Sequence, residues 1–380
     1  MKQDLIFILV SILLINCSNT NTSSVKYLQQ ADSVIHIPIN SNISSTTRNL
    51  RYFKDKEIEY IATENNHLNS IDIFNLNSRT LCKTVTPQIY GPDGIGTHIL
   101  GFDIVNFDTI IVGTNGIADK LFIIDSSAHL YEKIKFEISY EPYLPIPFLF
   151  SANWGGNSAN YDGEKLTLSA VCRTDESDFY KVDTCPAGYI YNLKTHKTEK
   201  LQLRQPEIIK LNPPIVYSES SILINQNKKI FSYELGHQVF VSTNDSSWTV
   251  YNLKSKYVKK PFNPGFGNDI IGSQTKFVES PAYLALVYDK YRHVYYRFVY
   301  PGIDVAKGDD VMKLCEFCRI FSVMIIDEDF NVLGETLMPE NTYNSNMFFI
   351  NEAGLWISTN HPDNPDFEED AINFQLFNLK

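Results

Sequence analysis

The chain has 380 residues, of which 43% are hydrophobic, and a net charge of −11 at pH 7. This length suits one large domain or two ordinary ones. The Lys and Arg residues form no cluster, and nucleic-acid binding requires cationic side chains concentrated on one face, so the composition argues against a nucleic-acid partner. With 22 Tyr and 24 Phe, and without long stretches rich in Leu, Ala, Glu and Lys, the sequence indicates a β-protein.

The first residues have the pattern of an export signal. Lys2 precedes an apolar run from Leu5 to Ile15, which is too short for a membrane-spanning anchor and has the length of a secretory signal core. Cys17 follows almost directly, as in a bacterial lipoprotein signal that is cut before the cysteine so that the thiol takes a lipid. The alternative is an ordinary cleaved signal or a short uncleaved anchor, because Asn16 departs from the strict preference for a small residue before the cysteine.

We therefore interpret residues 1–16 as a lipoprotein signal peptide, 17–32 as a flexible polar tether and 33–380 as the folded domain. Acidic residues of the kind that direct lipoproteins to the cell surface do not follow Cys17. We expect an exported protein, lipid-anchored to the outer membrane on its periplasmic face. No other segment approaches the roughly 20 apolar residues of a membrane-spanning helix.

Five further cysteines predict disulfides, since cysteine pairs in exported proteins are usually oxidised. Cys172 and Cys185 bracket a polar loop, and Cys315 and Cys318 form the motif CEFC, so we expect each pair to be bridged. Cys82 is left over, and we expect it to be buried and inert. Two alternatives remain for CEFC: a redox pair, which needs a helix N-terminus to lower a thiol pKa, or a zinc site shared with the other pair.

One local pattern recurs six times, about every 50 to 75 residues. Each copy is a run of β-branched or aromatic residues that ends in Asn or Asp, which tolerates a left-handed backbone and can bond its own backbone two residues on. Two strands precede most copies and one strand follows five of them, so each unit has four antiparallel strands. Units of this kind are typical of a β-propeller. The six strand ends are Asn75, Asp125, Asn192, Asn252, Asp327 and Asn378.

The strand pattern predicts where each unit begins. In the fourth unit we expect strands at 230–235, 238–242, 248–254 and 257–262. The last unit, which ends with 374–380, lacks its outer strand, and the alternating segment 33–39 precedes the first unit without belonging to it. Pairing these two segments removes an open edge. The expected fold is all-β: a six-bladed β-propeller with four antiparallel strands per blade, closed by an N-terminal strand. A two-sheet sandwich is the alternative.

Three stretches carry a resemblance to a known family. YGPDGIGTHILGFDIVNFDTIIV (90–112), KLFIIDSSAHLYEKI (120–134) and VYDKYRHVYYRFVYPG (287–302) resemble a family of Bacteroidetes lipoproteins of unknown function. The resemblance covers about residues 60–380 and implies a six-bladed propeller. The family has no assigned catalytic residues, so the resemblance implies no site.

The segment YGPDGIG, Tyr90 to Gly96, has the glycines of a phosphate-binding loop. Such a loop leads into a helix whose N-terminus faces the anion, but a strand pattern follows here. Glycine permits a turn with positive φ, and proline stiffens it. We interpret the segment as a joint between blades one and two, and whether Asp93 also faces a ligand stays open.

A propeller blade, with strands A to D from the axis outward, places its A–B and C–D turns on one rim and its B–C and D–A loops on the other. The first turns are short, and we call their side the short-turn rim; the second are long and varied, and we call theirs the long-loop rim. Long loops on a rigid scaffold commonly carry function. We expect an unknown protein, glycan or peptide to bind there. Candidate contacts are aromatic, amide, His or acidic side chains: Asp93, Asn153, Trp154, Tyr343, Asn344, His361 and Asp363.

No catalytic set stands out. The eight His residues lack metal-ligand spacing, and no G-x-S-x-G nucleophile elbow is present. We therefore expect no catalytic residue, no metal and no cofactor, and a membrane-tethered monomer that serves as a non-catalytic binding or scaffolding module. One alternative is a glycan hydrolase or lyase that uses rim carboxylates such as Asp363 and Asp93. Another is a structural lipoprotein without a small ligand.

Overall fold

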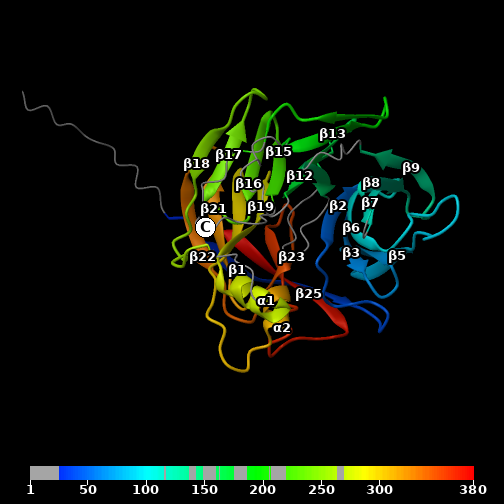
Figure 1. Ribbon diagram of the computed structural model, residues 1–380. Coiled ribbons are helices and arrows are strands. Elements are labelled where there is room, and N and C mark those ends of the chain that lie inside the picture. Colours follow the sequence, from blue (N-terminus) through cyan, green and yellow to red (C-terminus); the bar gives the residue numbers. More distant parts are fainter. Residues whose placement is uncertain are drawn as a thin grey trace, which may run out of the picture.

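The structure is a computed structural model that describes residues 25–114, 117–136, 143–148, 160–161, 163–174, 186–204, 206, 220–262 and 269–380. These residues form six sheets of antiparallel strands placed around a ring (Figure 1). The chain is a six-bladed β-propeller with four strands per blade, as the repeat predicts; the alternative of a two-sheet sandwich is wrong.

The first three blades follow one another in chain order. Blade one contains β2 (Leu50–Asp55), β3 (Ile58–Asn65), β4 (Ser70–Asn75) and β5 (Thr80–Val85). Blade two contains β6 (Ile99–Asn106), β7 (Thr109–Thr114), β8 (Ile117–Ile124) and β9 (Leu130–Lys135). Blade three contains β10 (Tyr143–Phe148), β12 (Lys165–Thr174), β13 (Gly188–Asn192) and β14 (Lys197–Lys200), with the short β11 (Asn160–Tyr161) paired to β12.

The other three blades complete the ring. Blade four contains β15 (Ser220–Asn225), β16 (Lys228–Tyr233), β17 (Gln238–Ser242) and β18 (Thr249–Asn252). Blade five contains β19 (Ala282–Asp289), β20 (Val294–Tyr300), β21 (Ser322–Asp327) and β22 (Val332–Leu337). Blade six contains β23 (Asn344–Ile350), β24 (Leu355–Ser358), β25 (Ala371–Leu379) and, as its outer strand, β1 (Leu28–Pro38).

The predicted strands of blade four are shifted by one whole strand: the segment predicted as the first strand is the second strand of the blade. The structure makes 220–225 the innermost strand and 249–252 the outermost one, and 257–262 is not a strand. The segment SSILIN begins with two serines and resembles a loop, yet it pairs with β16 through a tight turn in which Gln226 has φ +54°. Asn252 therefore ends an outer strand. The Asx residue of the C–D turn is Asn244, whose side chain accepts the N–H of Ser246 at 3.1 Å.

Asx turns hold the C–D corners of four other blades, as predicted. A side-chain oxygen accepts the backbone N–H two residues on, at 2.8 to 3.0 Å, in each case. This contact satisfies a backbone donor where the chain reverses direction. The four residues are Asn75, Asp125, Asn192 and Asp327.

The ring closes through β1, which pairs with β25 as predicted. The strand is longer than expected, because Leu28 already pairs with Leu379; residues 28–32, predicted as tether, therefore belong to blade six. A bulge lies between Gln30 and Val34. Since β25 runs towards the short-turn rim, β1 starts at that rim and ends at the long-loop rim.

One apolar cluster lies at each of the six blade interfaces. Between blades one and two, for example, Phe53 packs in the same cluster as Phe102. Between blades six and one, Phe374 belongs to the cluster of Phe74. Burial of each such side chain is worth roughly 1.5–3 kcal/mol, which explains why every blade needs both neighbours. No helix in the described ranges is long and apolar enough to cross a membrane.

Candidate functional site

Two short helices distinguish the long-loop rim. The A–B and C–D turns that the structure describes have six residues or fewer, except for the partly described β10–β12 link. The connections on the other rim hold α1 (Ile270–Glu279), between blades four and five, and α2 (Val311–Glu316), within blade five. The loop asymmetry is confirmed. The carboxylates of Asp269 and Asp310 cap the two helices by accepting N–H groups of the first turn, at 2.6 and 3.1 Å.

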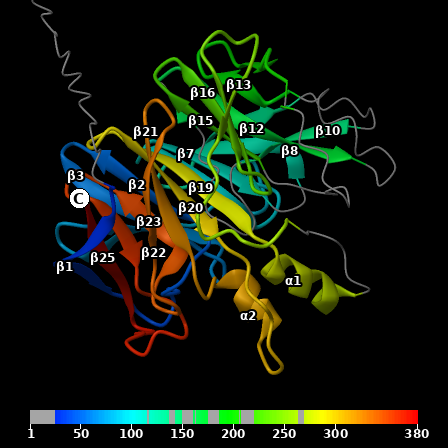
Figure 2. The same cartoon turned by 90° about the vertical axis from the view of Figure 1, so that its left-hand side faces the viewer.

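The two helices pack side by side (Figure 2), and α2 also contacts a loop of blade six. The Cys315 thiol donates to the Gln274 side-chain oxygen at 2.9 Å, which links α2 to α1. The Lys313 ammonium lies 2.5 Å from the Asp363 carboxylate, which links α2 to the blade-six loop 359–370. We call α1, α2 and this loop the helix face.

The helix face exposes apolar side chains in acidic surroundings. Ile270, Ile271 and Met312 are 73%, 53% and 50% exposed, respectively. The segments 269–281, 301–319 and 359–371 together contain 11 acidic and four basic residues. Exposed apolar side chains on two helices that pack together are a surface feature from which an interaction site can be built. The surface suits a partner segment that is both apolar and basic.

A polar network fixes the inner end of α2. The Arg48 guanidinium lies 3.5 Å from the Glu316 carboxylate, and the Asn346 amide donates to the Glu316 carbonyl at 3.1 Å. Next to this link, the amide of Asn49 donates to the carboxylate of Glu64. Burial raises the pKa of Glu64 to about 7, against the lowering effect of that amide and of the nearby arginines. Blades one and six thus hold the helix in place.

Four of the predicted contact residues come together at the end of blade six. Tyr343 is buried, with its ring 5.3 Å from that of Phe377, and Asn344 is buried and accepts the N–H of Asn346 at 3.0 Å. His361 is 1% exposed, and burial lowers its pKa. These three side chains shape the loop. Asp363 is part of the helix face, and its contact with a ligand stays a prediction.

Asp93 lies apart from this group, in the connection between blades one and two. Gly91 and Gly96 have φ of +98° and +87°, Gly94 donates to the Gly91 carbonyl at 3.1 Å, and β6 follows. The interpretation of YGPDGIG as an inter-blade joint is confirmed. Cys17, Asn153, Trp154 and Cys185, together with the side chain of Cys172, lie outside the described residues.

The remaining cysteines correct two predictions. Cys315 and Cys318 are not joined by a disulfide, because Cys315 lies in the last turns of α2 and Cys318 is buried beyond its end. Burial raises the pKa of Cys315 to about 11 and raises that of Cys318 as well, which opposes thiolate formation. Cys82, predicted to be buried, is exposed on the outer strand β5. No group of three or more His, Cys, Asp or Glu among the described residues could hold a metal ion.

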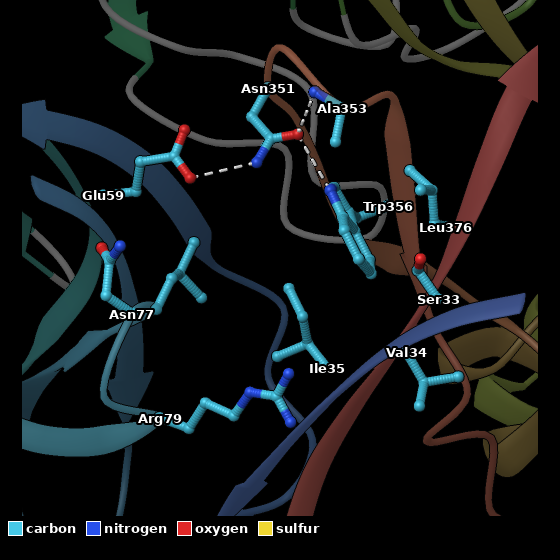
Figure 3. Close-up of a pocket in the computed structure, with 11 residues that line it drawn as sticks. Ser33, Val34, Ile35, Glu59, Asn77, Arg79, Asn351, Ala353, Trp356 and Leu376 are labelled. Carbon is cyan, nitrogen blue, oxygen red and sulfur yellow. Dashed lines mark hydrogen bonds between the residues drawn. The ribbon is translucent and has the colours of Figure 1, made fainter. Parts of the chain in front are cut away.

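A cleft, which we call the seam cleft, lies between blades six and one, towards the short-turn rim (Figure 3). The cleft has a volume of about 430 Å³. Its apolar lining comes mainly from Ile35, Leu76, Trp356 and Leu376, and its polar lining from Glu59, Asn77, Arg79 and Asn351. No local pattern in the sequence predicts this cleft.

Hydrogen bonds connect the residues at the polar end of the cleft. Glu59 accepts the Tyr52 hydroxyl at 2.7 Å and the Asn351 amide at 3.2 Å. The Asn351 side-chain oxygen accepts the Trp356 indole N–H at 2.9 Å (Figure 3). This relay fixes the Glu59 carboxylate and the Trp356 ring relative to each other, across the boundary between two blades.

Comparisons with known proteins agree with this architecture. The model of a family described as a domain of unknown function, DUF4221, matches residues 21–337. A DUF4221 protein from Bacteroides vulgatus has a solved structure with 23% identity and a TM-score of 0.82, covering 94% of this chain and 99% of its own. A Bacteroides fragilis protein, named as an exported protein, has 8% identity and a TM-score of 0.52, covering 96% and 98%. At these identities both solved structures are similar in fold alone. No curated protein matches the sequence.

Proposed function

The chain belongs to the DUF4221 family, whose function is unknown, and we propose that it is a binding module that holds a partner protein on the helix face. Its own surface residues support this role. The observation that carries this proposal is the packed pair α1 and α2, which exposes Ile270, Ile271 and Met312 among acidic residues. The partner segment is apolar on one side and basic on the other. The charges guide its approach, and the three apolar side chains supply most of the affinity.

The position of β1 determines how a lipid tether on Cys17 orients the propeller. On our reading of the N-terminus, Cys17 carries a lipid and the chain enters the propeller through Leu28. Because β1 starts at the short-turn rim, the tether joins the domain on that side. The long-loop rim then faces away from the membrane, where a partner reaches it. The Bacteroides fragilis protein of the same fold is named as exported, in keeping with export of this chain. We propose that the lipid then holds the domain on the periplasmic face of the outer membrane.

The helix face supports binding more than glycan cleavage. Glycoside hydrolysis requires two carboxyl groups that flank one bond, with one of them protonated. Asp363 instead lies 2.5 Å from the Lys313 ammonium, so its carboxylate already has a partner within the protein. Asp93 belongs to the connection between blades one and two, whereas Asp363 lies in a loop within blade six. The surroundings of these two acids therefore favour binding over glycan cleavage.

Site-specific photo-crosslinking in the native host tests the proposal. We would place a photoreactive phenylalanine analogue at Met312 and, as a matched control, at Val250, an exposed apolar residue (56%) on the outer strand of blade four. We expect a specific protein to be captured from position 312 and not from position 250. Adding Ile271→Asp should abolish that capture without lowering the amount of folded protein. Equal capture from both positions, or capture unaffected by Ile271→Asp, would contradict the proposal.

A further inference from the structure

The seam cleft lies towards the opposite rim from the helix face, and its chemistry is independent of the function proposed above. Its wall comes from two blades and from the closing strand: Glu59 from β3, Arg79 from the C–D turn of blade one, Trp356 from β24 and Ile35 from β1. The volume of about 430 Å³ falls within the range of small-molecule sites. It is therefore large enough for a small ligand.

Two side chains of opposite charge, Glu59 and Arg79, line different parts of the cleft. In Figure 3 Glu59 lies at one end and the Arg79 side chain at the other, extended towards Ile35. Glu59 accepts hydrogen bonds from two neutral groups, and Arg79 is exposed with only its backbone N–H bonded, to the Asn75 carbonyl at 2.8 Å. Within the described chain neither side chain has an ion-pair partner. A carboxylate has about four lone-pair positions and a guanidinium five N–H donors, so both retain capacity for a ligand.

Apolar side chains line much of the rest of the cleft. Trp356 and Leu376 come from blade six, and Leu76 comes from blade one. The Trp356 ring is fixed by its bond to Asn351 and by stacking on Phe349, with ring centroids 5.9 Å apart and an interplanar angle of 13°. A wall held in this way is preformed, so a ligand need not order it on binding.

We propose that the seam cleft binds an apolar zwitterion of the amino-acid or short-peptide class. The ligand ammonium pairs with Glu59, the ligand carboxylate forms a two-pronged bond with Arg79, and the apolar side chain packs on Trp356. Guanidinium and carboxylate groups match in geometry, which makes Arg79 the group that selects the ligand carboxylate. A ligand without one of the two charges leaves one end of the cleft uncompensated.

Calorimetric titration of the purified full-length chain in detergent tests this assignment. The probes are L-leucine and the dipeptide Leu-Leu, compared with leucinamide, which lacks the carboxylate, and N-acetylleucine, which lacks the ammonium. We expect binding of leucine, the dipeptide or both, with each neutralised analogue at least about tenfold weaker, as charge-assisted hydrogen bonds predict. Tighter binding of Leu-Leu identifies a peptide ligand, and tighter binding of leucine identifies a free amino acid.

Two variants separate the cleft from other causes. Arg79→Gln should weaken the zwitterion at least about tenfold and leave leucinamide unchanged, whereas Lys307→Gln, at an exposed position of the other rim, should have no effect. Arg79 is exposed, so its replacement leaves the fold intact. The assignment is overturned if neither leucine nor Leu-Leu binds at millimolar concentration, if the neutralised analogues bind equally well, or if Arg79→Gln binds like the wild type. None of these results bears on the helix face, because that face shares no residue with the cleft.

Discussion

The guanidinium of Arg297 lies over the ring of Tyr283, with its central carbon 3.7 Å from the ring centroid. Arg297 is fully buried at the interface of blades four and five. It donates to the carbonyls of Gly236 and His237 at 3.0 and 2.9 Å and to the Ser232 hydroxyl at 3.0 Å. A cation thus caps the B–C corner of blade four from the neighbouring blade, without a carboxylate partner in these contacts.

Arg297→Met should destabilise the propeller by about 3 kcal/mol. The variant keeps an apolar side chain of similar length but leaves the partly buried carbonyl groups of Gly236 and His237 without this donor. A polar group that loses its partner in such a place costs about 1–3 kcal/mol. Urea unfolding followed by circular dichroism measures the change. Lys307→Met, at an exposed position, serves as the control and should stay within about 0.5 kcal/mol of the wild type. An Arg297→Met protein as stable as that control would show that the corner does not depend on the cation.

His237 should make the protein less stable in acid. Burial, together with the positive charges of Lys254 and Arg297, lowers its pKa to about 4, and its ring nitrogen Nδ1 lies 2.7 Å from the Tyr283 hydroxyl. The folded state therefore binds the proton less readily than the unfolded state, whose pKa is about 6.5. This contribution is complete above pH 6.5 and is lost as the pH falls towards 4. The difference in unfolding midpoint between wild type and His237→Gln should shift in that window, with Gln less sensitive to acid. Parallel pH profiles would contradict the prediction.

Glu64 should act in the opposite direction. Its pKa of about 7 in the folded state is above the ordinary value of 4.5, so the folded state holds a proton that the unfolded state has lost. The stabilisation is complete below pH 4.5 and disappears as the pH rises through 7. Glu64→Gln keeps an oxygen that can accept the Asn49 amide and carries no charge. We expect it to raise the free energy of unfolding at pH 8 by about 1–3 kcal/mol, with little change at pH 4. Glu164→Gln, at a partly exposed position, is the control; an equal effect in both variants would exclude a specific role for Glu64.

Local signals explain how much of the fold the sequence predicts. A strand that ends in Asx needs only its own residues to turn back, so Asn75, Asp125, Asn192 and Asp327 mark their blades without tertiary information. Strand β1 is also predictable, because its alternating apolar and polar residues indicate a strand and the last blade lacks an outer strand to pair with. The prediction for blade four failed because the strand that ends at Asn252 has the same local pattern as the third strands of other blades. Only its pairing with β17 shows that it is the outer strand. Propensity cannot separate two strands that look alike.

The helices and cysteines required tertiary information. Asp269 and Asp310 are helix caps of a common kind, but α1 and α2 are short and gain stability from packing on each other. Once α2 forms, Cys315 contacts Gln274 rather than Cys318, so spacing alone predicted the wrong pairing. The predicted contacts Tyr343, Asn344 and His361 are in the right region, but burial makes them supports. Polar residues in a loop are consistent both with ligand binding and with hydrogen bonds inside the loop, so the sequence alone could not separate the two roles.

The seam cleft could not be predicted from local patterns. Glu59 and Asn351 are 292 positions apart, and they meet only because β1 joins the two ends of the ring. Neither residue belongs to a recognisable motif. Arg79 is an ordinary turn residue with φ +58°, and its significance comes from facing an apolar wall contributed by another blade. Sites built across closing interfaces have this property in general, because their residues are separated in sequence.

The closing strand depends on a close backbone approach at Gly334. Lys26 donates its backbone N–H to the Leu333 carbonyl at 3.0 Å, and Leu28 donates to the Thr336 hydroxyl at 2.8 Å, so the N-terminal segment also bonds to the outer strand of blade five. A Cβ atom at Gly334 would lie 1.8 Å from the Lys26 carbonyl oxygen, a distance that no real structure permits. Gly334→Ala should therefore displace the segment around Lys26 and lower the free energy of unfolding by about 1–3 kcal/mol. Limited proteolysis should cut the variant between Lys26 and Pro38 faster than the wild type. Gly236→Ala, where a Cβ atom meets its nearest neighbour at 3.6 Å, is the control, and equal protease resistance of Gly334→Ala and this control would show that the ring closes without the contact.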